Sequence, residues 1–142
     1  TIIPTLQQIG EMAQSHTGSA RELLAQQMKI AAMRMASPEM KTLLRHMISG
    51  GSRHRKIIDF YYNNVVQKGL EHFKVTLDQG LKSGEFRNEI KKIDPLVLVG
   101  APVYTAVWNI LFADMNPIDA EKLVNDQMEI VFNGLLNEPE RI

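Results

Sequence analysis

Three pairs of a helix-capping residue and a proline divide the chain: Ser37-Pro38, Asp94-Pro95 and Asn116-Pro117. Such a pair is typical of a helix start, because the capping side chain accepts a hydrogen bond from a free amide of the first turn and proline has no amide to leave unpaired. Between these pairs, apolar residues recur at intervals of three and four, the spacing of one helix face. The sequence has no alternating strand pattern, hairpin dipeptide or fixed-period repeat. It therefore predicts an all-α fold.

Six helices are expected in a single domain of 142 residues. Ser19 and Glu22 have the spacing of a capping box, in which each side chain satisfies an amide at the start of the same helix. Gly50-Gly51 is expected to end one helix, and Ser52 to cap the next. The predicted helices span about 4–15, 20–36, 38–49, 52–83, 95–113 and 117–136.

The stretch from Leu81 to Pro95 is expected to connect two of these helices. Gly84 can adopt the left-handed conformation that closes a helix, and Asp94-Pro95 begins the next one. Phe86 is predicted to anchor the connector in the core.

Pro102 is an anomaly inside the predicted helix 95–113. Proline in a helix interior removes one backbone hydrogen bond and clashes with the carbonyl four residues earlier, which costs about 3 kcal/mol. Gly100 weakens the helix further. A kink that makes room for a ligand and an accommodation to packing explain this proline equally well.

Composition excludes several classes of protein. Sixteen basic and sixteen acidic side chains cancel, so the net charge favours neither nucleic acid nor a membrane surface as partner. There is no cysteine, which is compatible with the cytoplasm and excludes thiolate metal sites. No apolar run is long enough to span a membrane. No phosphate loop, nucleophile elbow or zinc motif is present, so no cofactor, metal or catalytic residue is predicted.

Eight methionines and nine aromatic residues suggest an apolar pocket. Methionine is flexible and polarizable, which suits a pocket for varied apolar ligands. Tyr62, Tyr104 and Trp108 add polar tips to this set, so a cavity could hold an amphipathic molecule by a few hydrogen bonds. The alternative is that these residues fill an ordinary helical core. The residues predicted to line the pocket are Met28, Met35, Tyr62, Val66, Tyr104 and Trp108.

The last predicted helix has two apolar faces, which is more than a single core requires. Gly134 on one face would permit close approach of another backbone. Together with the nearly all-apolar helix 95–113, this indicates an interface between two copies, with two helices from each chain. The predicted interface residues are Val103, Val107, Leu123, Gln127, Ile130 and Gly134.

This pattern resembles the C-terminal domain of the TetR family of bacterial transcriptional regulators. The resemblance is carried by Leu81-Lys-Ser-Gly-Glu-Phe-Arg, Ile93-Asp-Pro95 and Ile130-Val-Phe-Asn-Gly-Leu-Leu136, with the apolar helix between. It implies an effector-binding domain whose last two helices form a four-helix bundle in a homodimer. It also implies that the effector binds between the helices at 4–15, 20–36, 52–83 and 95–113. The family's N-terminal helix-turn-helix is absent, so this chain is expected to contact DNA only through a domain that it does not contain.

We therefore expect a cytoplasmic, homodimeric sensor of a small apolar or amphipathic effector, with residues 1–93 mainly sensing and 94–136 mainly dimerising. A helical adaptor without a small-molecule ligand and a small helical enzyme are the alternatives. An enzyme predicts a buried carboxylate or histidine that faces a cleft. An adaptor predicts a solid core.

Overall fold

The computed structural model describes residues 18–135, so the helix predicted at 4–15 lies outside the described part. Four shorter helical segments connect or interrupt the α-helices: Gly51–His54, Asn88–Lys92 and Pro95–Val99 are 3₁₀ turns, and Tyr62–Val66 is a π-helical turn. Residues 18–135 contain no strand, which confirms the predicted all-α fold. The α-helices are α2 (Ala20–Met35), α3 (Pro38–Gly50), α4 (Arg55–Tyr61), α5 (Gln67–Ser83), α6 (Gly100–Leu111) and α7 (Ala120–Leu135).

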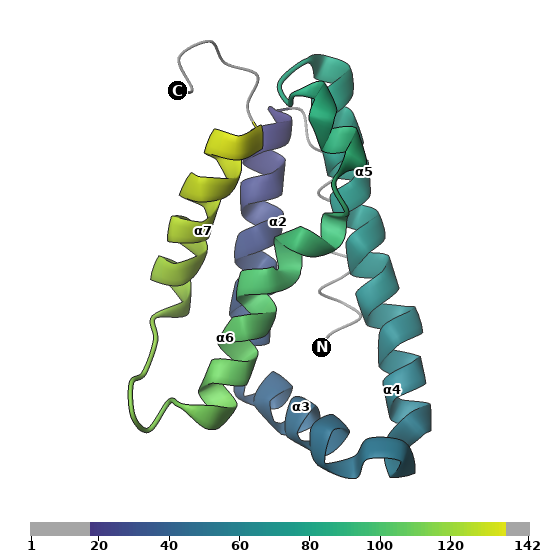
Figure 1. Ribbon diagram of the computed structural model, residues 1–142, viewed down its shortest axis with the longest axis vertical. Helices are drawn as coiled ribbons and strands as arrows, with labels where there is room; N and C mark the ends of the chain where they lie inside the picture. Colours follow the sequence, from purple (N-terminus) through teal and green to yellow (C-terminus); the bar gives the residue numbers. More distant parts are fainter. Residues whose placement is uncertain (1–17, 136–142) are drawn as a thin grey trace.

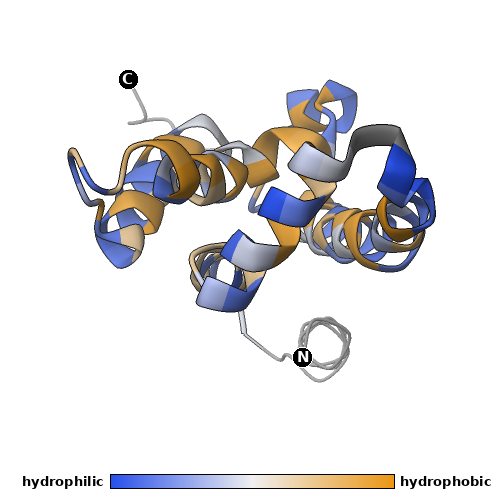
Figure 2. Cartoon of the chain, turned by 90° about the horizontal axis from the view of Figure 1, so that it is seen from below, coloured by the Kyte–Doolittle hydropathy of each residue, from blue (hydrophilic) through white to orange (hydrophobic). Residues whose placement is uncertain are grey.

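Helix α2 lies at the centre of the fold and contacts α5, α6 and α7 (Figure 1). Helix α3 crosses below it, and α4, the π turn and α5 form one continuous helical rod along the other side. Hydrophobic and hydrophilic residues share each helix, as expected of amphipathic helices (Figure 2). None of the helices in residues 18–135 has the length and apolar character needed to cross a membrane. The core joins the central helix to its neighbours through Leu24, Met28, Phe73, Leu77, Phe86, Leu98, Val124 and Phe132.

Three of the predicted helix starts are confirmed by their caps. The Ser19 hydroxyl accepts a hydrogen bond from the Glu22 amide at 3.1 Å, at the start of α2. At the start of α3, the Ser37 hydroxyl accepts from the Met40 amide at 3.2 Å. The Asp94 carboxylate accepts from the Leu96 amide at 2.9 Å. Each bond satisfies an amide that the helix itself leaves free.

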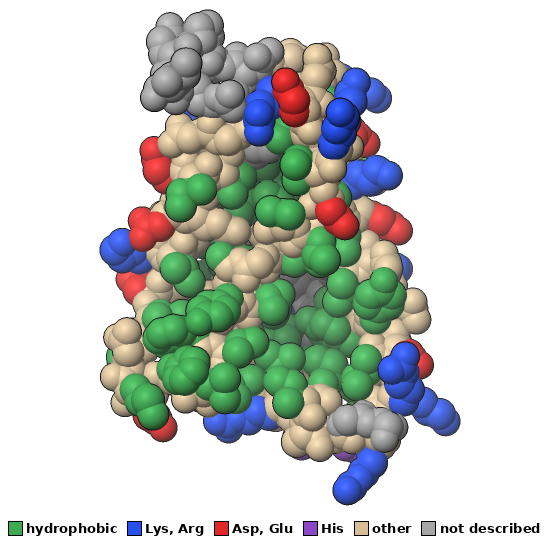
Figure 3. Space-filling view, in the orientation of Figure 1, with side chains coloured by type: hydrophobic (Ala, Val, Ile, Leu, Met, Phe, Trp, Pro, Cys, Tyr) green, Lys and Arg blue, Asp and Glu red, His purple; other side chains and the backbone are tan. Residues whose placement is uncertain are grey.

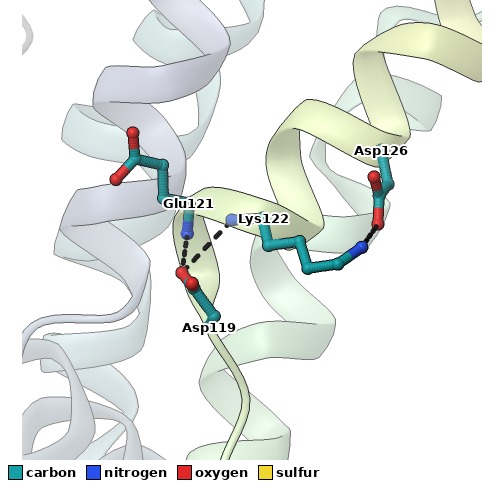
Figure 4. Close-up of polar contacts among 4 residues, drawn as sticks. All are labelled: Asp119, Glu121, Lys122 and Asp126. Atoms are coloured by element: carbon teal, nitrogen blue, oxygen red, sulfur yellow. Dashed lines mark hydrogen bonds and ion pairs between the residues drawn. The ribbon is translucent and has the colours of Figure 1, made fainter.

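The last helix begins at Ala120 and not at the predicted Pro117. Asp119 caps it, because one carboxylate oxygen accepts from the amides of Glu121 and Lys122 at 3.0 and 3.2 Å (Figure 4). Lys122 also pairs with Asp126 one turn later, at 2.6 Å. The aspartate takes the cap because its two bonds satisfy two free amides at the positive end of the helix.

The predicted regular helix 52–83 is wrong in two respects. Its first α-helical residue is Arg55, preceded by the 3₁₀ turn Gly51–His54, and His54 at the N-cap makes no capping hydrogen bond through its side chain. The side chain of Ser52, the predicted cap, lies outside the described part of the structure. Further along, the amide of Gln67 bonds to the carbonyl of Tyr62, five residues back, which makes a π turn. A π turn adds one residue to a helix, so it shifts the facing of all residues on one side of it.

The predicted single helix 95–113 is also wrong. A 3₁₀ turn occupies Pro95–Val99, and α6 begins only at Gly100. Pro102 therefore lies in the first turn of α6. Amides in the first turn have no partner within the helix, so proline, which has no amide hydrogen, loses no hydrogen bond there. Neither explanation of an interior proline applies, because Pro102 interrupts no helix.

The connector at residues 84–87 binds three helices together. Gly84 has a φ of 82° and ends α5 in the left-handed conformation, as predicted. The Glu85 carboxylate accepts from the Ala20 amide at 3.0 Å, at the positive end of α2. The Arg87 Nε donates to the Gly134 carbonyl at 2.6 Å, near the end of α7. Phe86 is only 1% exposed, which confirms it as the predicted anchor.

Replacement of Gly80 by alanine tests this anchor. A methyl group at Gly80 would lie 2.1 Å from the Phe86 ring, which is fully buried and cannot move aside. We expect Gly80→Ala to lower the free energy of unfolding by about 1–3 kcal/mol, the usual cost of overpacking, measured by urea denaturation. Gly100→Ala is the control, since its methyl group meets no atom within 4 Å. Equal stabilities of the two variants would contradict this packing.

Candidate functional site

A cavity of about 270 Å³ lies between α2, α3, the α4–α5 rod and α6. In Figure 3 the surface is hollowed between α6 and the rod, and apolar side chains surround the hollow. Its walls are almost wholly apolar, as is usual for sites of small molecules. The lining residues are Ala31, Arg34, Met35, Met40, Leu44, Met47, Tyr61, Val65, Val66, Gly69, Leu70, Phe73, Val99, Pro102, Val103 and Val107.

Two lining side chains carry polar groups that can direct a ligand, Arg34 and Tyr61. Arg34 lies in the last turn of α2, and its buried Nε and Nη2 atoms have no hydrogen-bond partner among residues 18–135. The Tyr61 hydroxyl donates to the Met40 sulfur at 3.6 Å, a weak acceptor. Both groups therefore have hydrogen-bonding capacity that the described residues 18–135 leave largely unused.

The π turn brings Tyr61 to the cavity. Counting back from Phe73 in regular helical steps leads through Val66 to Tyr62, but the extra residue of the π turn puts Tyr61 on that face. Burial raises the pKa of Tyr61, and the nearby Arg34 charge opposes part of that rise. Tyr61 therefore stays neutral at physiological pH and keeps a hydroxyl that can donate a hydrogen bond.

The six residues predicted to bind a ligand are divided between three places. Met35 and Val66 line the cavity. Met28 is fully buried in the core beneath it. Tyr62 is 50% exposed, and its hydroxyl accepts from the Gln67 amide group. Tyr104 is 56% exposed and Trp108 is half-buried, and neither is among the described lining residues.

Tyr104 and Trp108 belong to an exposed aromatic row on α6. The two ring centroids are 5.9 Å apart, and Phe112 follows at 5.0 Å from Trp108 in an edge-on contact. The indole nitrogen donates to the Asn116 carbonyl at 2.6 Å, which ties the row to the connector before α7. The row is therefore held in place by ring contacts and one hydrogen bond, with Tyr104 and Phe112 exposed and Trp108 half-buried between them.

The residues predicted for the dimer interface follow two helices. On α6, Val103 is 43% exposed, and both Val103 and Val107 also line the cavity. On α7, Ile130 is 76% exposed, whereas Leu123 and Gly134 are half-buried. The amide nitrogen of Gln127 donates to the Leu98 carbonyl of the same chain at 3.3 Å.

Sequence reasoning missed the contribution of α3 and of Arg34 to the cavity. Met40, Leu44 and Met47 are apolar at helical spacing, which was a usable signal for one wall. Arg34 gave no signal, because a basic residue in the last turn of a helix is ordinary.

Acidic residues and histidines do not gather in this site. None of the described lining residues is an aspartate, glutamate or histidine. Within residues 18–135 no three such residues come together as metal ligands would. Burial lowers the pKa of His72, and Glu71 beside it partly opposes this shift. His72 is not among the lining residues, so its titration is not connected with the cavity.

Comparisons of the chain with protein-family models, curated proteins and solved structures gave no match.

The stability of the protein at alkaline pH tests the placement of Tyr61. A raised pKa means that the folded protein favours the neutral phenol, so this contribution to stability is complete below the ordinary value of 10.0 and is lost as the pH rises above it. We expect Tyr61→Phe to remove part of the loss of stability between pH 9 and about 11, measured by urea denaturation. Tyr62→Phe is the matched control, because Tyr62 is 50% exposed and is not among the described residues that line the cavity. The reverse result would put Tyr62 in the cavity.

Proposed function

We propose that this chain is the effector-binding and dimerising domain of a TetR-like transcriptional regulator. A small apolar or amphipathic molecule binds in the cavity and controls DNA binding by a helix-turn-helix domain of the regulator. The observation that carries the proposal is the cavity itself, which is apolar and has two polar groups with unused hydrogen-bonding capacity.

The position of the cavity supports this function. Three of its walls come from α2, the α4–α5 rod and α6, which correspond to three of the four helices that the resemblance assigns to the effector. A volume of about 270 Å³ is near the lower end of the range for ligand pockets, so the proposed effector is small.

The exposed apolar surface supports the dimer. Val103, Tyr104 and Leu111 lie at helical spacing on the outer side of α6, and each is more than 40% exposed. Ile130 adds a fourth apolar side chain from the adjacent helix α7. A contiguous exposed apolar patch of this kind marks an interaction site, and a second copy that presents the same patch would cover it.

Ligand binding is tested with a pair of valine variants on the helical rod. Val66 lines the cavity, whereas Val75 is 47% exposed and does not. A panel of small amphipaths should contain members that raise the melting temperature of the wild type and of Val75→Phe, because a ligand that binds only the folded state stabilises it. Val66→Phe should abolish the effect, since its ring occupies the cavity.

The adaptor hypothesis makes the opposite prediction for the same experiment. If the domain only binds a protein or a second copy of itself, no amphipath stabilises the wild type. That result would overturn the proposed sensing function.

Dimerisation is tested by Gly134→Arg. A side chain at Gly134 meets no atom within 4 Å in the single chain, so arginine should leave the fold intact and obstruct only a partner's backbone. We expect sedimentation equilibrium to give a dimer for the wild type and a monomer for this variant. Asn125→Arg is the control. Asn125 is exposed and lies about two and a half turns before Gly134, so it is on the opposite side of α7. An unchanged dimer mass for Gly134→Arg would remove this face from the interface.

A further inference from the structure

We propose that the effector is a small amphipathic carboxylic acid, whose carboxylate pairs with Arg34 and whose apolar tail fills the cavity. This inference rests on the proposed function, because it names the chemistry of the molecule that the cavity binds.

The first argument is the missing counter-charge. Arginine is always protonated, and a buried cation is normally paired with an acid. None of the residues from the described part of the chain that line the cavity is acidic. The ion pairs recorded in residues 18–135 join Arg55 to Asp59 and Lys122 to Asp126, so neither involves Arg34. An anionic ligand would supply the charge that the described part of the chain does not.

The second argument is the geometry of the unused donors. The two buried nitrogens without a partner are Nε and Nη2, which form one edge of the guanidinium group. Their two N–H bonds are parallel, and they match the two oxygens of a carboxylate in a bidentate pair. A hydroxyl group can use only one of them, and an ammonium group can use neither, because it has no acceptor.

The third argument comes from Tyr61. Within residues 18–135 its hydroxyl donates to the Met40 sulfur, and Met40 and Tyr61 both line the cavity. A carboxylate oxygen is a far stronger acceptor than a thioether. If the Tyr61 hydroxyl donated to the ligand and not to the sulfur, the carboxylate would gain a third donor in addition to the two nitrogens of Arg34.

The size of the cavity limits the tail. The cavity volume of about 270 Å³ is just below the usual range for ligand pockets, which favours a short tail. Octanoate is a carboxylic acid of that kind. With the carboxylate at Arg34, its tail would contact the apolar side chains of α3, the rod and α6.

The alternative role for Arg34 is structural. It lies in the last turn of α2, where a positive charge interacts favourably with the negative end of the helix. That role predicts a change of stability when Arg34 is replaced, but it predicts no preference between ligands. A selectivity measurement therefore separates the two roles.

The test compares octanoate, octan-1-ol and octylammonium, which share a tail and differ in the head group. Affinities are measured by isothermal titration calorimetry on the wild type, Arg34→Met, Tyr61→Phe and the control Arg45→Met, whose parent residue is exposed on α3 and outside the cavity. We expect the wild type and Arg45→Met to prefer octanoate. Arg34→Met should lose about tenfold or more of the octanoate affinity, as on removal of a charged hydrogen bond, and should gain relative affinity for octan-1-ol. Tyr61→Phe should weaken octanoate binding to a smaller extent.

Each other outcome has a definite meaning. If octan-1-ol or octylammonium binds the wild type as tightly as octanoate, the carboxylate inference is wrong and the sensing function stands. Unchanged octanoate affinity in Arg34→Met would also overturn the inference. If none of the three probes binds, the inference is wrong, and the thermal-shift panel of amphipaths decides the sensing function separately. The head-group ranking of the wild type needs no variant, so it decides the matter even if Arg34→Met does not fold.

Discussion

The connector at residues 84–87 places the helix on which the cavity depends. Glu85 accepts hydrogen bonds at the start of α2, and Phe86 packs against Gly80 at the end of α5. Arg87 binds the carbonyl of Gly134 on α7. Since α2 has 16 residues and is about 24 Å long, its start and its Arg34 lie far apart. The connector holds the start of α2, and Arg34 lies at the other end of the same helix. It therefore helps to set the position of Arg34 in the cavity.

Local chemistry explains which parts of the fold the sequence predicts. Helix starts depend on a few neighbouring atoms, so the caps at Ser19, Ser37 and Asp94 could be recognised from residue type and spacing. The π turn could not be recognised in this way. Its extra residue is stabilised by packing against other helices, and no local pattern of residues marks its position. The prediction is therefore wrong by one position: Tyr62 was predicted to line the cavity, and Tyr61 lines it.

The cavity shows the same division between local and long-range information. Met35 and Val66 could be predicted because they are apolar and lie on a recognisable face. Met28 has the same local pattern, yet it is packed solid between α2 and its neighbours. The unpaired state of Arg34 depends on which side chains from α3, the rod and α6 surround it, and no neighbour in sequence determines that. Arg34 is therefore central to the proposed binding chemistry, although no pattern in the sequence distinguishes it from other basic residues.

Helix α6 belongs both to the cavity and to the exposed apolar surface. Val103 and Val107 line the cavity, and Val103 with Tyr104 also faces outward. The segment before α6 is a 3₁₀ turn, whose hydrogen bonds are weaker than those of an α-helix. Under the proposed function, a ligand bound to Arg34 on α2 and packed against α6 would favour one distance between these helices. A ligand shifts a conformational equilibrium only by its difference in affinity for the two states. A ligand that contacts both helices at once supplies such a difference. Under the proposed function, the resulting change in the position of α6 would reach the partner subunit through the outer face of this helix.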